Sequence, residues 1–334
     1  MSVKRLLATA THSSAFGHLV SLLETASGGG DALRILTYHR VDLPERTPLL
    51  SPALNSATPE GFEAQMRYVA ENYEPVSVRD VQLYFDEHRP LPPRAVLITF
   101  DDAYRDFAEH AWPILKRYHI PVALFVATGY PDQPGKAFWW DRLYAALEQT
   151  RVQKVATPFQ NPLLLATPQQ RTRAFKQLRT YVKSLPHEEA LAWVDSFCAQ
   201  LEVELPAENP VLGWNDLRRL AAEGVTLGAH TRTHPMLNRL SLQAVREEVA
   251  GSLRDLRDQL GDVMPIFAYP GGGLTDAVVN VLRDEGVTLA FTTVRGVNRM
   301  QTADRLRLKR INVGRLASLA IIRMQLLGLT VEVA

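Results

Sequence analysis

The sequence predicts an α/β fold built on a parallel sheet, and two observations support this prediction. Runs of apolar residues alternate along the chain with segments in which apolar residues recur at spacings of three and four. Most of the apolar runs are continuous, which is typical of strands that are covered on both faces. This alternation indicates βαβ units. The seven candidate strands are 33–40, 95–100, 121–128, 225–230, 265–270, 287–294 and 306–313.

Amphipathic helices are predicted between these strands. Thr58, Ser241 and Thr275 stand where helix N-caps are expected, and Gly261 and Gly286 stand where helices would end. Seven strands are too many for a small sheet and one short of a barrel of eight βα units. The clearest helical segments are 60–72, 104–119, 241–261 and 275–286.

Residues 137–213 interrupt the alternation with several helical patterns joined by proline-containing loops. We expect a helical insertion between two barrel strands. It would be either a lid or wall of a substrate groove, or a purely structural excursion. Trp139 and Trp140 open the insertion, where they would stack on sugar rings or belong to a core.

Bulk composition and the two ends of the chain narrow the class of protein. The net charge of +1 gives no electrostatic footprint for nucleic acid, and the single cysteine, Cys198, excludes an intrachain disulfide. We expect a helical segment and a glycine-rich joint over residues 1–30, followed by a barrel over residues 31–315. The tail 316–334 predicts a docked helix and strand, with a membrane-surface segment as the alternative. We find no export signal or spanning helix and therefore expect a cytoplasmic location, with peripheral membrane contact as a further alternative.

Two adjacent acids, Asp101 and Asp102, follow the apolar run 95–100. Buried charges need partners, so two carboxylates at the end of a buried strand are a poor structural choice. Neighbouring residues on a strand point to opposite faces, which indicates that the two acids have different tasks. The alternative is a helix N-cap for the segment 104–119.

His230 ends another predicted strand, and His234 follows four residues later. Two imidazoles at this spacing share a face of a helical turn and can hold a divalent metal ion, although either histidine could simply cap a turn. Sites in parallel α/β folds form at the carboxyl ends of strands, so the fold would bring both histidines to the acid pair. Two histidines and one carboxylate leave a position open for water and substrate.

The motifs TFDDAY, HTRTHP and FAYPGG resemble those of the polysaccharide deacetylases, the NodB-homology family of carbohydrate esterases. The likeness covers roughly residues 33–313. It implies a distorted (β/α)7 barrel and metal-dependent removal of an acetyl group from an amino sugar. It also implies that Asp102, His230 and His234 hold the metal and that Asp101 is the general base. Zinc is the expected ion, although this ligand set also suits cobalt, nickel or iron.

The chain departs from the family pattern at the third motif. Ala268 stands where the family has an arginine that tunes the base, and Arg310 at the end of the last strand would supply a guanidinium instead. The alternative for Arg310 is a structural surface residue. The backbone around Gly271, after Tyr269 and Pro270, would donate to an oxyanion or form a tight turn before a helix. Tyr104, after the acid pair, is a further candidate for substrate contact.

No histidine follows His234, so the family's usual C-terminal acid is absent. His39 is the other histidine that ends a predicted strand. Its setting, YHRV, resembles the permuted branch of the family that contains the poly-N-acetylglucosamine deacetylases. The resemblance implies that His39 protonates the leaving amine; the alternative is a histidine satisfied by neighbouring backbone.

The sequence therefore predicts a metal-dependent N-deacetylase. Its expected substrate is an N-acetylated amino-sugar glycan of a surface or extracellular polysaccharide, or its lipid-linked precursor. The alternatives are a deformylase or cyclic amidase of the same fold, and a catalytically silent carbohydrate-binding barrel that the missing arginine would explain. No serine-hydrolase elbow or Walker loop is present.

Overall fold

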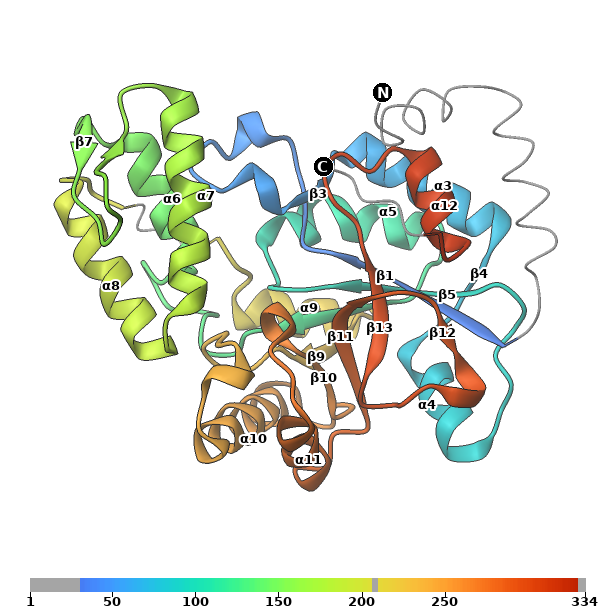
Figure 1. Cartoon of the computed structure of the whole chain (residues 1–334). Helices are drawn as coiled ribbons and strands as arrows, with labels where there is room; N and C mark the ends of the chain where they lie inside the picture. Colours follow the sequence, from blue (N-terminus) through green and yellow to red (C-terminus); the bar gives the residue numbers. More distant parts are fainter. Residues whose placement is uncertain (1–30, 206–209, 330–334) are drawn as a thin grey trace.

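A closed barrel of seven parallel strands forms the centre of the computed structural model, which describes residues 31–205 and 210–329 (Figure 1). The last strand pairs with both its predecessor and the first strand, which closes the barrel. The predicted (β/α)7 barrel is confirmed. Around the barrel the strands are β1 (Ala32–Tyr38), β5 (Ala95–Phe100), β6 (Val122–Val126), β9 (Thr226–Ala229), β10 (Ile266–Ala268), β11 (Leu289–Arg295) and β13 (Leu308–Asn312).

Short strands that the sequence did not predict accompany the barrel. β4 (Glu74–Pro75) pairs with β5, and β12 (Asn298–Arg299) pairs antiparallel with β1. A separate two-stranded sheet joins β2 (Arg40–Val41) to β3 (Asn55–Ala57) just after β1. These pieces are too short to show a pattern in the sequence.

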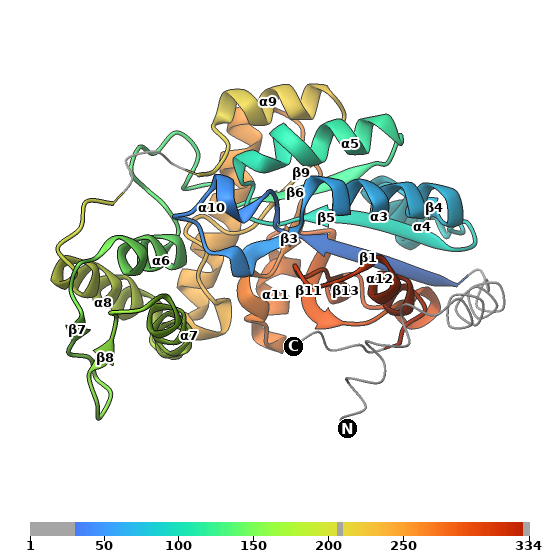
Figure 2. The same cartoon turned by 90° about the horizontal axis from the view of Figure 1, so that it is seen from above.

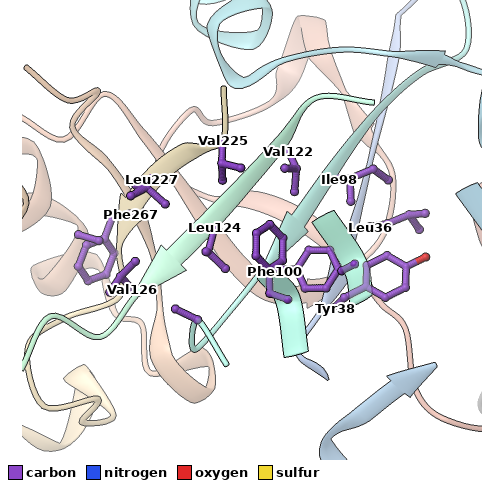
Figure 3. Packing of buried hydrophobic residues seen from close by; sticks show 14 of the residues in the cluster. Leu36, Tyr38, Ile98, Phe100, Val122, Leu124, Val126, Val225, Leu227 and Phe267 are labelled. Atoms are coloured by element: carbon purple, nitrogen blue, oxygen red, sulfur yellow. The ribbon is translucent and has the colours of Figure 1, made fainter. Parts of the chain in front are cut away.

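Along most of the barrel strands, alternate residues belong to two different hydrophobic cores. On β5, Ile98 and Phe100 face the surrounding helices, whereas Leu97 packs inside the barrel. Figure 3 shows the outer core, where the stacked rings of Tyr38 and Phe100 lie 5.2 Å apart between centroids. Burial on both faces explains why the strands are continuous apolar runs.

Helices surround the barrel, as the view from above shows (Figure 2). The predicted caps are confirmed: Thr58, Ser241 and Thr275 each accept a backbone hydrogen bond in the first turn of a helix. Trp214 opens the helix before β9 and is buried in the outer core. These helices are α3 (Pro59–Asn72), α5 (Trp112–Arg117), α9 (Trp214–Ala222), α10 (Leu242–Leu260) and α11 (Asp276–Asp284); the sequence missed α4 (Val78–Glu87).

The helix predicted over 104–119 is present from 105 to 117, but it is irregular. A π-helical turn spans Phe107–Ala111 before α5 begins, and the amide of Trp112 donates to the carbonyl of Phe107. Pro113 has no N–H for the regular bond to the residue four positions earlier, which accounts for the irregular turn.

The insertion forms a lobe with its own hydrophobic core beside the barrel, drawn in green in Figure 1. Its predicted helices are confirmed, and a small hairpin lies between the first two. Cys198 is buried in the last helix, where burial raises the pKa of its thiol to about 11. The elements are α6 (Trp139–Gln149), β7 (Lys154–Val155), β8 (Leu163–Leu164), α7 (Pro168–Ser184) and α8 (His187–Gln200).

The two predicted end segments are described in part. Helix α12 (Leu319–Leu326) packs against α3, which confirms a docked helix in the tail. The predicted segment 1–30 and the last predicted strand, at 330–334, lie outside the described residues. Among the helices that the structure describes, none is both long and apolar enough to cross a membrane.

Candidate metal centre

Both acids at the end of β5 line one cavity at the carboxyl end of the barrel. Asp101 continues the inward face of Leu97 and Thr99, so strand alternation aims its carboxylate into the barrel mouth. Asp102 has a φ of 71° and Ala103 a φ of 51°. This left-handed turn brings Asp102 to the same cavity, although neighbouring strand residues would diverge.

Asp102, His230 and His234 form a cluster whose ligand atoms all lie within 4.8 Å of one another. Oδ1 of Asp102 is 3.2 Å from Nε2 of His234 and 3.5 Å from Nε2 of His230. That oxygen is buried and has no hydrogen-bond partner in the described part of the chain. A buried acceptor without a partner is costly, and a cation between these three atoms would satisfy it.

The imidazole of His230 is oriented for a ligand role. Its Nδ1 lies 2.8 Å from the carbonyl oxygen of Ala268, which indicates a proton on Nδ1 and a lone pair on Nε2. Burial lowers the pKa of His230 to about 4, despite the opposing charge of Asp101. The ring is therefore neutral at pH 7, as metal binding requires.

His234 is positioned by the loop that joins it to His230. Its backbone N–H donates to Oγ1 of Thr231 at 3.0 Å, and its ring meets Trp140 edge-on at 4.8 Å between centroids. Glu248 of α10 fixes the same loop, because its carboxylate accepts from the backbone amides of Arg232 and Thr233 and from the Thr233 hydroxyl. The residues present therefore fit a divalent metal ion with two nitrogen ligands and one oxygen ligand.

Arg310 contacts Asp101 directly, as the sequence suggested for the position of the missing arginine. Nη1 donates to Oδ1 at 2.8 Å and Nη2 to Oδ2 at 2.7 Å, with both side chains buried. Burial acts to raise the pKa of Asp101, but the Arg310 charge and that of His230 outweigh it and hold the pKa well below its usual range. Asp101 is therefore ionised at neutral pH. The alternative of a surface role for Arg310 was wrong.

His39 and Gly271 both line this cavity, together with the acid pair. His39 is half-buried; its backbone N–H donates to Oγ of Ser56 at 3.0 Å, and its charge helps to lower the pKa values of Asp101 and Asp102. Gly271 has a φ of 56°, which favours glycine, and an added Cβ would meet Met236 at 3.3 Å.

Three of the candidate substrate contacts do not reach the cavity. Tyr104 is fully buried, and its hydroxyl donates to Oδ2 of Asp141 at 2.6 Å. Tyr269 is also fully buried and donates to the carbonyl of Leu306, and Pro270 is buried beside it. Their side chains are structural, so the prediction of substrate contact was wrong for these three.

The insertion forms one wall of the cavity, which favours the predicted wall of a substrate groove over a purely structural excursion. Trp139 and Trp140 of α6 line this wall, and Trp140 also stacks on Phe138 in the core of the lobe. The sequence did not single out several cavity residues, because in the sequence the charged ones resemble a solvated face and the apolar ones resemble ordinary core positions. These are Phe175, Arg179, Val182, Lys183, Leu185, His187, Ala190, Met236 and Arg239.

Known proteins are similar to this chain in sequence and in fold. A family model described as polysaccharide deacetylase matches residues 88–290. The chain belongs to the polysaccharide deacetylase family. The chain is 31% identical over 80 residues to poly-beta-1,6-N-acetyl-D-glucosamine N-deacetylase of Escherichia coli strain K12, and 33% identical over 75 residues to that of Staphylococcus aureus strain MSSA476.

These matches cover 24% and 22% of the chain and only 12% and 26% of the two relatives. Two solved structures share the fold over a greater length. PplD, a deacetylase of Streptococcus pyogenes in complex with acetate, aligns over 88% of this chain and 98% of its own with a TM-score of 0.59 and 19% identity. IcaB of Ammonifex degensii aligns over 90% and 98% with a TM-score of 0.59 and 20% identity.

Proposed function

We propose that this polysaccharide deacetylase is a metal-dependent hydrolase that releases acetate from N-acetylated amino sugars. The observation that carries the proposal is that the two adjacent acids have different surroundings in one cavity. Asp102 has an unpartnered oxygen facing two imidazoles, and Asp101 is held ionised by Arg310 in the same cavity. One acid can serve the metal while the other takes a proton.

Asp102, His230 and His234 would hold the ion, with zinc as the expected one. When bound, such an ion polarises a carbonyl oxygen and lowers the pKa of water. The ionised Asp101 is the general base that takes a proton from the attacking water. Arg310 orients its carboxylate, and the backbone N–H of Gly271 donates to the oxygen of the acetyl group as negative charge develops there.

His39 is the general acid in this proposal. It lines the cavity beside both acids and gives its proton to the sugar nitrogen as the amide bond breaks. The overall change is an amide and a water going to acetate and an amine. The relatives named for poly-beta-1,6-N-acetyl-D-glucosamine support an N-acetylglucosamine glycan as the substrate class.

The alternative of a catalytically silent carbohydrate-binding barrel was based on the absence of the motif arginine, whose position is occupied by Ala268. Because Arg310 contacts Asp101, nothing in the described residues favours that alternative. A deformylase or a cyclic amidase would use the same groups and is distinguished by its product. The cytoplasmic location and the peripheral membrane contact stay predictions.

The experiment that tests the proposal is acetate release from partly acetylated glucosamine oligomers by the full chain. We expect about one divalent ion per chain, acetate release that stops after chelation, and recovery when zinc is restored. An Asp102→Ala variant should lose the ion, whereas Asp101→Asn should keep the ion and lose activity. Formate release would replace the proposal with a deformylase, and activity that survives thorough chelation would refute the metal dependence.

A further inference from the structure

Three cationic side chains line the cavity beside the candidate metal centre. Arg179 and Lys183 stand one turn apart on α7, and Arg239 ends the short helix Leu237–Arg239 that follows His234. Within residues 31–205 and 210–329, no salt bridge joins any of these three side chains to a carboxylate. The cations therefore come to one cavity from two separate segments of the chain.

Among the described residues, the only carboxylates that line the cavity face groups other than these three cations. Asp101 is paired with Arg310, and Asp102 faces the imidazoles of His230 and His234. Arg310, Arg179, Lys183 and Arg239 give an excess of positive charge over the two acids, and a divalent cation at the candidate metal centre would increase it. The excess lies in the same cavity as the candidate metal centre.

The neighbouring cations on α7 oppose each other when no anion is bound. Desolvation lowers the pKa of Lys183, and the adjacent charge of Arg179 lowers it further. Like charges four residues apart on a helix destabilise it. An anion between them and Arg239 would relieve this repulsion.

We propose that the cavity takes an N-acetylated amino sugar that carries a phosphate group, and that Arg179, Lys183 and Arg239 bind this phosphate. The inference rests on the proposed deacetylase function and narrows its substrate class. Arginine meets phosphate oxygens through its planar fork and lysine meets them as a point charge, so the set suits a phosphate better than a neutral sugar. Phe175 and Val182 on the same wall supply apolar surface beside the charged group.

The test compares a neutral N-acetylglucosamine oligomer with UDP-N-acetylglucosamine and a short-chain prenyl diphosphate N-acetylglucosamine, using the metal-loaded full chain. We expect kcat/KM for at least one phosphate-bearing substrate to exceed that for the neutral oligomer, and to fall with rising salt. The double variant Arg179→Gln with Lys183→Gln should have a kcat/KM at least tenfold lower for that substrate. Its kcat/KM for the neutral oligomer should change by less than about threefold. A preference for the prenyl substrate would identify the substrate as a lipid-linked saccharide. Equal rates on the two phosphate-bearing substrates would show that the sugar phosphate itself is recognised.

The matched control is Arg173→Gln with Lys176→Gln, which removes the same charge from positions of α7 that are exposed, as Lys183 is, but do not line the cavity. It should change neither rate. An equal loss on neutral and phosphate-bearing substrates, or an equal effect of the control pair, would overturn the proposal.

Binding keeps this proposal separate from the deacetylase function. Phosphate-bearing sugars should bind the Asp101→Asn protein at least tenfold more weakly once Arg179 and Lys183 are replaced. If no substrate releases acetate but this loss of binding is seen, the deacetylase proposal fails and the phosphate site stands. If acetate is released without any phosphate preference in rate or binding, only the phosphate site fails.

Discussion

The guanidinium of Arg310 and the carboxylate of Asp101 form two parallel hydrogen bonds of 2.8 and 2.7 Å, across a contact between β13 and the end of β5. Ala268, on β10, stands where the family motif has an arginine. The barrel therefore places a guanidinium on this acid from a different strand, because both strands end at the same rim. Asp101, the proposed base, therefore has an electrostatic partner even though the local motif lacks the arginine.

Replacing Arg310 by Gln should lower kcat by about a hundredfold or more, because it removes the group that orients the base. It should also destabilise the fold by about 3–5 kcal/mol, since it leaves Asp101 as a buried charge without its partner. Acetate-release kinetics and denaturant unfolding measure the two effects. The double variant with Asp101→Asn should regain part of the lost stability, and purely additive losses would contradict direct coupling of the pair.

Replacing His39 by Gln should lower kcat by about 10²–10⁴-fold on an amide substrate, because the departing amine needs a proton. The loss should be much smaller on an activated acetyl ester, whose leaving group departs without protonation. His187→Gln is the matched control. His187 lines the same cavity, and the hydroxyl of Thr233 is the one polar group that contacts its imidazole in the described chain. Full turnover of the amide at saturating substrate in the His39 variant would remove His39 from this role.

Glu248 should control metal affinity without touching the ion. Its carboxylate accepts three hydrogen bonds from the loop between His230 and His234, at 2.7, 3.0 and 2.6 Å. Glu248→Ala should weaken metal binding by about 10- to 100-fold, as loss of an outer partner does in other metal sites. Competition with a chromogenic chelator measures this affinity. Glu247→Ala, on the same helix turn, should leave it unchanged, and equal affinities in the two variants would contradict the positioning role.

The parts of the fold that follow from local periodicity could be predicted from the sequence. The continuous apolar runs gave the seven strands, because both faces of each strand are buried. The acids after β5 and the histidine pair after β9 gave the candidate metal cluster, because parallel strands end at one rim. The helical turn expected between His230 and His234 is absent: a non-helical loop joins them, with a φ of 65° at Thr231 and 60° at His234.

Other features depend on contacts between distant segments and could not be predicted. Tyr104 follows a left-handed turn at Asp102 and Ala103, which sends its ring into the core of the insertion. Arg179 and Lys183 resemble an ordinary solvated helix face until α7 is placed against the barrel. Glu248 lies in an amphipathic helix, and nothing in its local sequence marks it as a loop anchor.

Asp141 should make stability fall as pH rises through neutrality. Its Oδ2 accepts from Tyr104, its Oδ1 is buried without a hydrogen-bond partner in the described chain, and burial raises the pKa of its carboxyl to about 7. The pKa of Asp141 is higher in the folded state than in the unfolded state. Its contribution to stability is therefore fully present below about pH 4 and is lost as the pH rises to about 7. Between pH 5 and pH 8, the ionisation of Asp141 alone should lower the free energy of unfolding by about 2–3 kcal/mol.

Asp141→Asn keeps an acceptor for Tyr104 and cannot ionise, so it removes this part of the pH dependence. Denaturant unfolding of the metal-free wild-type and variant proteins at pH 5 and pH 8 isolates the effect, because all other titrating groups are shared. The variant should gain stability relative to the wild type by about 2–3 kcal/mol on going from pH 5 to pH 8. A stability difference that stays constant across this range would show that Asp141 is ionised throughout and that its burial is offset by Arg40, whose charge opposes the rise in its pKa.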